Sequence, residues 1–270
     1  MKGESIMRKD LWKRLDEHYD EAKEYIKENN IVGIFCQGSQ NYGLEVPDSD
    51  LDTKLIITPT FKDIAFNHKP ISTTHIRKNN EHIDFKDIRL YIETFRKQNL
   101  NFLEILFTSY YYVNKNYSNE WQRLINARED VTHMNPYRAV RSMEGIAMEK
   151  FHAFEHPYPS KIEVLAKYGY DPKQLHHLCR VEDCLRRYIA GETYENCLHP
   201  TDPQFLIDIK LGKFSYDKAN KMRHESILNI KDMANTFYSF TSNTENQETL
   251  DLLHDVQYNI MKNTVKKELP

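Results

Sequence analysis

Glycine and cysteine are scarce in this chain. It contains 8 glycines in 270 residues, which predicts a helix-rich protein with few tight turns. Its 4 cysteines form no C-x-x-C pair and show no zinc-site spacing. We therefore expect a reduced, cytoplasmic protein.

Long apolar runs and a strong net charge are also missing. No stretch approaches the ~20 apolar residues that a membrane-spanning helix needs, so we expect no membrane partner. A net charge of -3 provides no overall basic field for nucleic acid, although a local patch such as residues 180–187 leaves that interaction open. The sequence contains no H-E-x-x-H zinc motif, no G-x-x-x-x-G-K-[ST] phosphate loop and no kinase signature.

The most informative segment is residues 38–52, which reads GSQNYGLEVPDSDLD. Apolar runs on either side predict strands at 31–35 and 50–58. Side chains alternate between the faces of a strand, so Asp50 and Asp52 should point the same way. Two adjacent carboxylates repel each other unless a cation lies between them, and all-oxygen ligands suit Mg²⁺.

The Gly38-Ser39 turn ahead of these aspartates offers backbone N–H groups to phosphate oxygens. A D-x-D pair alone is weak evidence, because aspartates after a strand often serve as turn or cap residues. The order of strand, Gly-Ser, short loop and D-x-D entering a second strand is more specific. It indicates a metal and a phosphate site, and therefore phosphoryl or nucleotidyl transfer.

This order resembles the nucleotidyltransferases of the DNA polymerase beta superfamily. The sequence of residues 38–52 is similar to one branch in particular, the predicted nucleotidyltransferases that are linked to RNA repair in bacteria and phages. The matching positions are Gly38, Ser39, Tyr42, Gly43, Leu44, Ser49, Asp50 and Asp52, whereas Asp48 lies outside the pattern. After the D-x-D pair this chain has Thr53 and Lys54, where the branch usually has an apolar residue or Arg followed by Gly. This difference leaves the identity of the substrate open.

The resemblance also implies a third carboxylate on a neighbouring strand, which would complete a two-metal site. Asp84 is the favoured candidate, because apolar residues flank it in a predicted strand that returns from a turn at 79–81. Asp87 is the alternative, although it also fits the N-cap of the helix that follows. We expect Glu93 and Glu104 to be surface or helix-terminal charges.

A second motif lies in the C-terminal half. Asp171 and Pro172 predict a helix start, after which Lys173, His177 and Arg180 fall on one helix face. From spacing alone a solvated charged stripe is the stronger interpretation. The suspected branch carries Tyr-Gly-Tyr-Asp-x-Lys-x-x-x-His-x-x-Arg here, with every position filled, and this resemblance implies contact with a nucleotide or triphosphate.

We therefore predict an α+β protein, with a nucleotidyltransferase-type mixed sheet and flanking helices at 1–115 and an all-helical nucleotide- and substrate-binding domain at 116–270. Asn101 is expected to cap a short helix at 102–107. Further helices are expected at 5–30, 118–130, 136–155, 160–168, 172–190, 203–211, 215–240 and 245–266.

The resemblance implies transfer of NMP from an NTP to a hydroxyl group, with release of pyrophosphate. Two Mg²⁺ ions, replaceable by Mn²⁺, would be held by Asp50, Asp52 and Asp84, while Gly38, Ser39 and Tyr42 would contact the nucleotide. An RNA end is the first acceptor, ahead of a protein hydroxyl and a small molecule. A nucleotide-binding sensor without turnover and a toxin that modifies tRNA or protein are the alternatives. The sequence does not identify which nucleotide is used, and it does not define the oligomeric state.

Overall fold

The computed structural model describes the backbone of residues 2–46 and 49–269, and side chains from residue 10 onward within these ranges. Pro47 and Asp48 lie outside the described residues. The described chain forms one five-stranded sheet in the order β3-β4-β2-β1-β5. The strands are β1 (Ile31–Gln37), β2 (Asp52–Ile57), β3 (Ser72–Ile76), β4 (His82–Asp87) and β5 (Tyr111–Val113).

The sheet is mixed, because β2 and β4 run parallel while the other neighbouring strands run antiparallel. The helices of the N-terminal half are α1 (Lys2–Tyr25), α2 (Phe61–Ala65), α3 (Ile88–Arg96) and α4 (Leu100–Leu103). Those of the C-terminal half are α5 (Ser118–Asn126), α6 (Arg128–Thr132), α7 (Pro136–Ala153), α8 (Ile162–Tyr168), α9 (Pro172–Ile189), α10 (Tyr194–Leu198), α11 (Pro203–Lys210), α12 (Tyr216–Phe240) and α13 (Gln247–Glu268).

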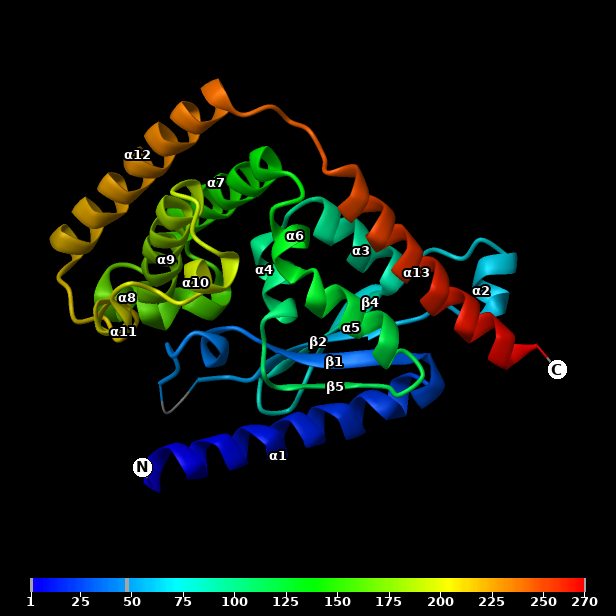
Figure 1. Cartoon of the computed structure of the whole chain (residues 1–270). Coiled ribbons are helices and arrows are strands. Elements are labelled where there is room, and N and C mark those ends of the chain that lie inside the picture. Colours follow the sequence, from blue (N-terminus) through cyan, green and yellow to red (C-terminus); the bar gives the residue numbers. More distant parts are fainter. Residues whose placement is uncertain (1, 47–48, 270) are drawn as a thin grey trace.

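Helices cover both faces of the sheet. α1 runs along one face, and the other helices gather on the opposite side (Figure 1). Under α1, Leu15 and Ala22 pack against Ile31, Ile34 and Leu55 in a small buried core. The larger core lies on the other face and continues into the helical half. The predicted α+β class is therefore confirmed.

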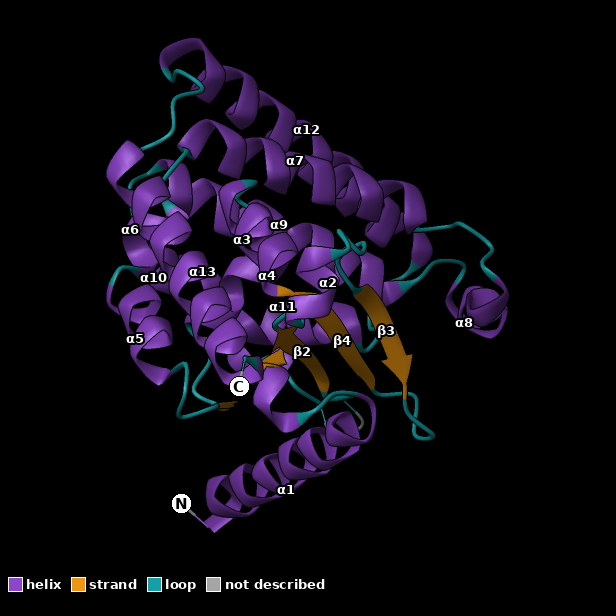
Figure 2. Cartoon of the chain, turned by 90° about the vertical axis from the view of Figure 1, so that its right-hand side faces the viewer, coloured by secondary structure: helices purple, strands orange, loops and turns teal. Residues whose placement is uncertain are grey.

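In the C-terminal half, α9 is the central helix and packs against α7, α10, α11 and α12. Figure 2 shows α7 and α12 side by side above this helix, while β3 forms one edge of the sheet. The last helix, α13, returns to pack against α3 and α5. The boundary between residues 115 and 116 stays a prediction. Within the described part of the chain, no helix has both the length and the apolar character needed to cross a bilayer.

Most predicted elements are confirmed, but several differ. The helix expected at 118–130 is divided at Ala127 into α5 and α6, and the strand expected from Asp50 begins at Asp52. The cap of α4 is Asn99, whose side chain accepts the Asn101 N–H, so the predicted cap at Asn101 is wrong by two residues. β5 and α10 were not predicted, because each is too short to show a periodic pattern. The caps Asp87 and Asp171 are confirmed, since each accepts a backbone N–H of the following helix.

Candidate functional site

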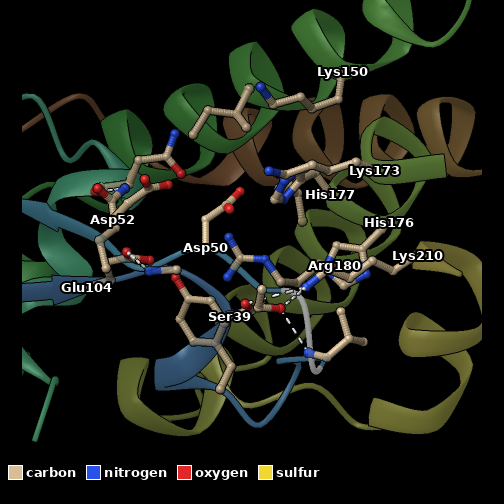
Figure 3. Close-up of a pocket in the computed structure, with 18 of the residues that line it drawn as sticks. Ser39, Asp50, Asp52, Glu104, Lys150, Lys173, His176, His177, Arg180 and Lys210 are labelled. Carbon is tan, nitrogen blue, oxygen red and sulfur yellow. Dashed lines mark hydrogen bonds between the residues drawn. The ribbon is translucent and has the colours of Figure 1, made fainter. Parts of the chain in front are cut away.

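A cavity of about 470 Å³ lies between the sheet and the helical half. This volume is within the range of small-molecule sites. From the N-terminal half it is lined by Gly38, Ser39, Tyr42, Asp50, Asp52 and Glu104, among others. From the helical half it is lined by Lys150, Lys173, His176, His177, Arg180 and Lys210 (Figure 3). The cavity thus joins the two motifs that lie more than a hundred positions apart in the sequence.

The Gly-Ser turn begins where β1 ends. Gly38 has a φ of 93°, a left-handed conformation that favours glycine, and a single 3-10 turn follows over Ser39–Asn41. The Gly38 N–H donates to Glu104 Oε1 at 3.0 Å. This N–H is therefore already used within the protein, and Ser39 is the first residue of the turn that faces the cavity with a polar side chain.

Both aspartates of the D-x-D pair line the cavity (Figure 3). Asp50 precedes β2 and is exposed, while Asp52 is the first residue of the strand and is partly buried. Asp52 Oδ1 accepts the backbone N–H of His82 at 3.1 Å and lies 3.0 Å from His82 Nδ1. One carboxylate is thus anchored to β4, and the other is directed into the cavity.

The structure does not bring Asp84 together with these two aspartates in the cavity lining. The parallel register of β2 and β4 places Lys54 opposite Asp84, and the two side chains form an ion pair. The Thr74 hydroxyl donates to the other carboxylate oxygen of Asp84. The third carboxylate expected from the sequence is therefore engaged with a buried lysine of the neighbouring strand.

Of the two positions expected for Glu104, the surface position is wrong, because this residue is only 1% exposed and borders the cavity. The helix-terminal position is confirmed, because Glu104 is the C-cap of α4. Burial raises the pKa of Glu104 to about 7, although nearby Arg180 and the Gly38 N–H favour its ionised form. Arg180 of the helical half lies near Glu104, and no local sequence pattern reveals such a long-range arrangement.

The basic wall of the cavity includes the three predicted residues of α9. Lys173 is exposed, whereas Arg180 is only 7% exposed, so the face is not a uniformly solvated stripe. The Arg180 guanidinium lies 4.4 Å from the centre of the Tyr42 ring. Its Nε has no hydrogen-bond partner among the described residues. A buried cation with an unused donor is an anion-binding feature.

The two histidines of α9 contribute polar groups without charge at neutral pH. Burial lowers the pKa of His176 to about 4, against a weaker opposite effect of the hydrogen bond that its Nδ1 makes with Leu206 O at 2.9 Å. Burial also lowers the pKa of His177 well below its usual value, and the neighbouring His176 and Arg180 act in the same direction.

Sequence reasoning missed Lys150, His176 and Lys210. Lys150 lies in α7, and Lys210 is the last residue of α11. Lys210 Nζ lies 3.1 Å from both Leu44 O and Ser49 Oγ, which ties α11 to the loop that carries the D-x-D pair. The two lysines belong to no local motif. His176 is adjacent to the predicted site residue His177, and this adjacency is a signal that the sequence does contain.

The donor set of the cavity fits a hard cation that also binds a ligand. Among the described residues, no group of three or more His, Cys, Asp and Glu side chains is arranged to hold a metal ion. Asp50 and Asp52 provide carboxylate oxygens, and Mg²⁺ is commonly held by one or two carboxylates together with substrate phosphates. A nucleotide phosphate would therefore supply the remaining oxygens.

No family model and no curated protein sequence matches this chain. A solved structure of a nucleotidyltransferase-like protein from Exiguobacterium sibiricum aligns with 84% of this chain and 75% of its own, at 10% identity and a TM-score of 0.32.

Proposed function

We propose that the protein is a Mg²⁺-dependent nucleotidyltransferase and that the cavity binds its nucleoside triphosphate. The observation that carries this proposal is the buried Arg180, whose Nε is unpartnered among the described residues and which borders the same cavity as Asp50 and Asp52. A polyphosphate suits both Arg180 and the aspartate pair. Its oxygens accept hydrogen bonds from cations, and they also bind a metal ion that carboxylates hold.

The charges of the cavity support a highly anionic ligand. Among the described residues, four lysine and arginine side chains line it, namely those of Lys150, Lys173, Arg180 and Lys210. Asp50 and Asp52 face them, and Glu104 adds at most a partial negative charge near neutral pH, because its pKa is about 7. Bound Mg²⁺ would neutralise charge between the phosphates and the two aspartates and would polarise the reacting phosphoryl group.

In this arrangement the protein acts mainly by binding and orientation. Lys173 and Arg180 would hold the phosphates from one side, and the Ser39 hydroxyl would contact them from the other. The acceptor hydroxyl would attack the α-phosphorus, so that a new P–O bond forms while the bond to pyrophosphate breaks. Pyrophosphate leaves, and the proton of the hydroxyl passes to solvent or to a carboxylate of the cavity.

For the acceptor, we propose an RNA end, as the sequence resemblance implies, ahead of a protein hydroxyl. The two-ion arrangement expected from the sequence stays a prediction, because Asp84 is engaged with Lys54. This same engagement favours one alternative, a nucleotide-binding regulatory protein without turnover. Such a protein needs the anion site and has no need of a third carboxylate.

The test uses Asp50→Asn and Asp52→Asn, with Asp232→Asn as a matched control on the exposed surface of α12. Each protein is incubated with each α-labelled NTP and Mg²⁺, together with total cell RNA and protein. We expect label transfer and pyrophosphate release from the wild type and the control, and a loss of at least ~100-fold in each site variant.

Equal transfer by a double variant of Asp50 and Asp52 would show that the site is assigned wrongly. A wild type that binds ATP with Mg²⁺ but releases no pyrophosphate with any acceptor would support the regulatory alternative. Labelling of tRNA or protein, with growth arrest on expression, would instead indicate the toxin alternative.

A further inference from the structure

The segment that carries the D-x-D pair, residues 49–53, is fixed by hydrogen bonds to residues outside the cavity. The backbone of Ser49 and Leu51 and the side chain of Thr53 meet a polar network beneath the segment, while the Ser49 hydroxyl itself borders the cavity. Arg14 of α1 donates to Ser49 O at 3.1 Å, and the Leu51 N–H donates to Glu81 Oε1 at 3.2 Å. Thr53 Oγ1 lies 2.9 Å from His18 Nδ1. Residues 49, 51 and 53 are therefore each bound by this network, and Asp50 and Asp52 between them line the cavity.

Glu81 is the centre of this network. It lies just before β4 and is 3% exposed. Its carboxylate accepts from Arg14 Nε at 2.9 Å and from Arg77 at 2.8 Å, and it lies 2.8 Å from His18 Nε2. Burial would raise the pKa of Glu81, but hydrogen bonds from His18 and Arg14 outweigh it and lower the pKa to about 2.

His18 completes the connection in its neutral form. The residue is fully buried, and burial lowers its pKa despite the neighbouring Glu81. In the neutral ring with its proton on Nε2, Nε2–H donates a hydrogen bond to Glu81, and Nδ1 accepts a hydrogen bond from the Thr53 hydroxyl. The ring therefore links the carboxylate of Glu81 to the strand residue that follows Asp52.

We infer that Arg14, His18 and Glu81 are positioning residues, which fix the backbone of residues 49–53 and thereby the spacing of the Asp50 and Asp52 carboxylates. The Leu51 peptide joins the two aspartates, so a rotation there would move both side chains. The Leu51 side chain is also fully buried against Leu11 and Cys36. What the carboxylates bind rests on the proposed function, whereas their placement rests on these contacts alone.

A purely structural role accounts less well for the network. Apolar contacts of Leu15 and Ala22 already attach α1 to the sheet. Buried charges cost desolvation energy, and an apolar replacement is often equally stable. Outer residues that orient metal ligands commonly change metal affinity by about 10–100-fold when they are replaced. The position of this network, directly behind the carboxylate pair, fits that role.

The test compares Glu81→Gln with Glu21→Gln, a matched control in the same polar cluster. Glu21 accepts from Arg77 Nε at 2.7 Å and contacts His75, but none of its recorded bonds reaches residues 49–53 among the described residues. Arg14→Gln, at the more exposed side of the network, serves as a second variant in case Glu81→Gln fails to fold.

The first readout is hydrogen exchange at the Leu51 amide, and the second is Mn²⁺ binding in the presence of ATP. We expect Glu81→Gln to accelerate exchange at Leu51 and to weaken Mn²⁺ binding by about 10–100-fold, while Glu21→Gln changes neither. Arg14→Gln should act in the same direction as Glu81→Gln. Thermal unfolding of all variants reports their stability.

Exchange and Mn²⁺ binding in Glu81→Gln that match those of Glu21→Gln would overturn the inference. If the wild type binds no Mn²⁺, the proposed function fails instead. In that case Leu51 exchange still decides the positioning role, because it needs no ligand. Unchanged exchange then refutes the role, and faster exchange confined to Glu81→Gln and Arg14→Gln supports it.

Discussion

The guanidinium of Arg180 lies 4.4 Å from the centre of the Tyr42 ring. Arg180 belongs to α9 in the helical half, and Tyr42 belongs to the loop that follows β1. The contact therefore joins the two halves of the molecule at the wall of the cavity. The ring offers a favourable surface to the cation but cannot accept the Nε proton, which has no partner among the described residues.

Replacement of Arg180 by Met should separate binding from stability. We expect Arg180→Met to weaken ATP binding by at least ~10-fold, while thermal stability stays equal or rises, because a buried and poorly paired cation is removed. Calorimetric titration and thermal unfolding measure the two effects. Arg186→Met, on the same helix but 55% exposed in its side chain, is the control and should bind ATP normally. Strong destabilisation with unchanged ATP affinity would contradict the assignment.

Replacement of Asp84 tests the register of β2 and β4. We expect Asp84→Asn to lower the free energy of unfolding by about 1–3 kcal/mol, because Lys54 is 5% exposed and loses its partner. ATP affinity should stay within about twofold of the wild type, a difference of roughly 0.4 kcal/mol. Urea unfolding and ATP titration measure both quantities.

A double variant, Asp84→Asn with Lys54→Met, is the control for that experiment. It removes both charges and should recover part of the lost stability. If Asp84→Asn instead folds normally and loses label transfer as Asp52→Asn does, Asp84 joins the site when the nucleotide binds, as the sequence predicted.

Features that depend on adjacent residues were predictable from the sequence. Asp87 and Asp171 could be recognised as caps because a cap is defined by the residues beside it. Asp50, Asp52 and Arg180 could be recognised because short motifs contain them. These residues and the periodic helices explain why the fold class and much of the cavity lining were predictable.

Features that depend on distant segments were not predictable. Lys210 reaches the D-x-D loop from a helix about 160 positions further along the chain. The pairing of Asp84 with Lys54 depends on the parallel register of two strands, which the sequence of either strand does not define. Glu104 is buried, and Arg180 of the helical half lies near it, only in the folded protein.

Glu104 should make stability decrease as the pH rises. Its pKa in the folded protein is about 7, above the usual value of 4.5, so the folded state retains a proton that the unfolded state releases. Stability is therefore lost between pH 4.5 and 7 and levels off above that range. We expect Glu104→Gln to be more stable than the wild type at pH 8, by up to about 3 kcal/mol, and similar to it at pH 4.5.

Glutamine retains the oxygen that accepts the Gly38 N–H, so the comparison isolates the charge. Urea unfolding at the two pH values measures the difference. A stability difference between variant and wild type that does not change with pH would contradict the raised pKa.

His176 should have the opposite dependence on pH. Burial lowers its pKa to about 4, so the folded state keeps the ring neutral while the unfolded state binds a proton near pH 6.5. Its contribution to stability is complete above pH 6.5 and is lost as the pH falls toward 4. At pH 5 the loss from this residue alone should be about 2 kcal/mol.

His176→Asn removes the titrating ring and retains an N–H donor for Leu206 O, which His176 Nδ1 contacts at 2.9 Å. His177 titrates in the same direction, so the wild type combines both effects and only the difference between the proteins isolates His176. We expect urea unfolding at pH 7.5 and pH 5 to show a smaller loss of stability in His176→Asn than in the wild type. His254→Asn, which changes an exposed histidine of α13, should behave as the wild type does. Equal losses in all three proteins would show that His176 is not held neutral by burial.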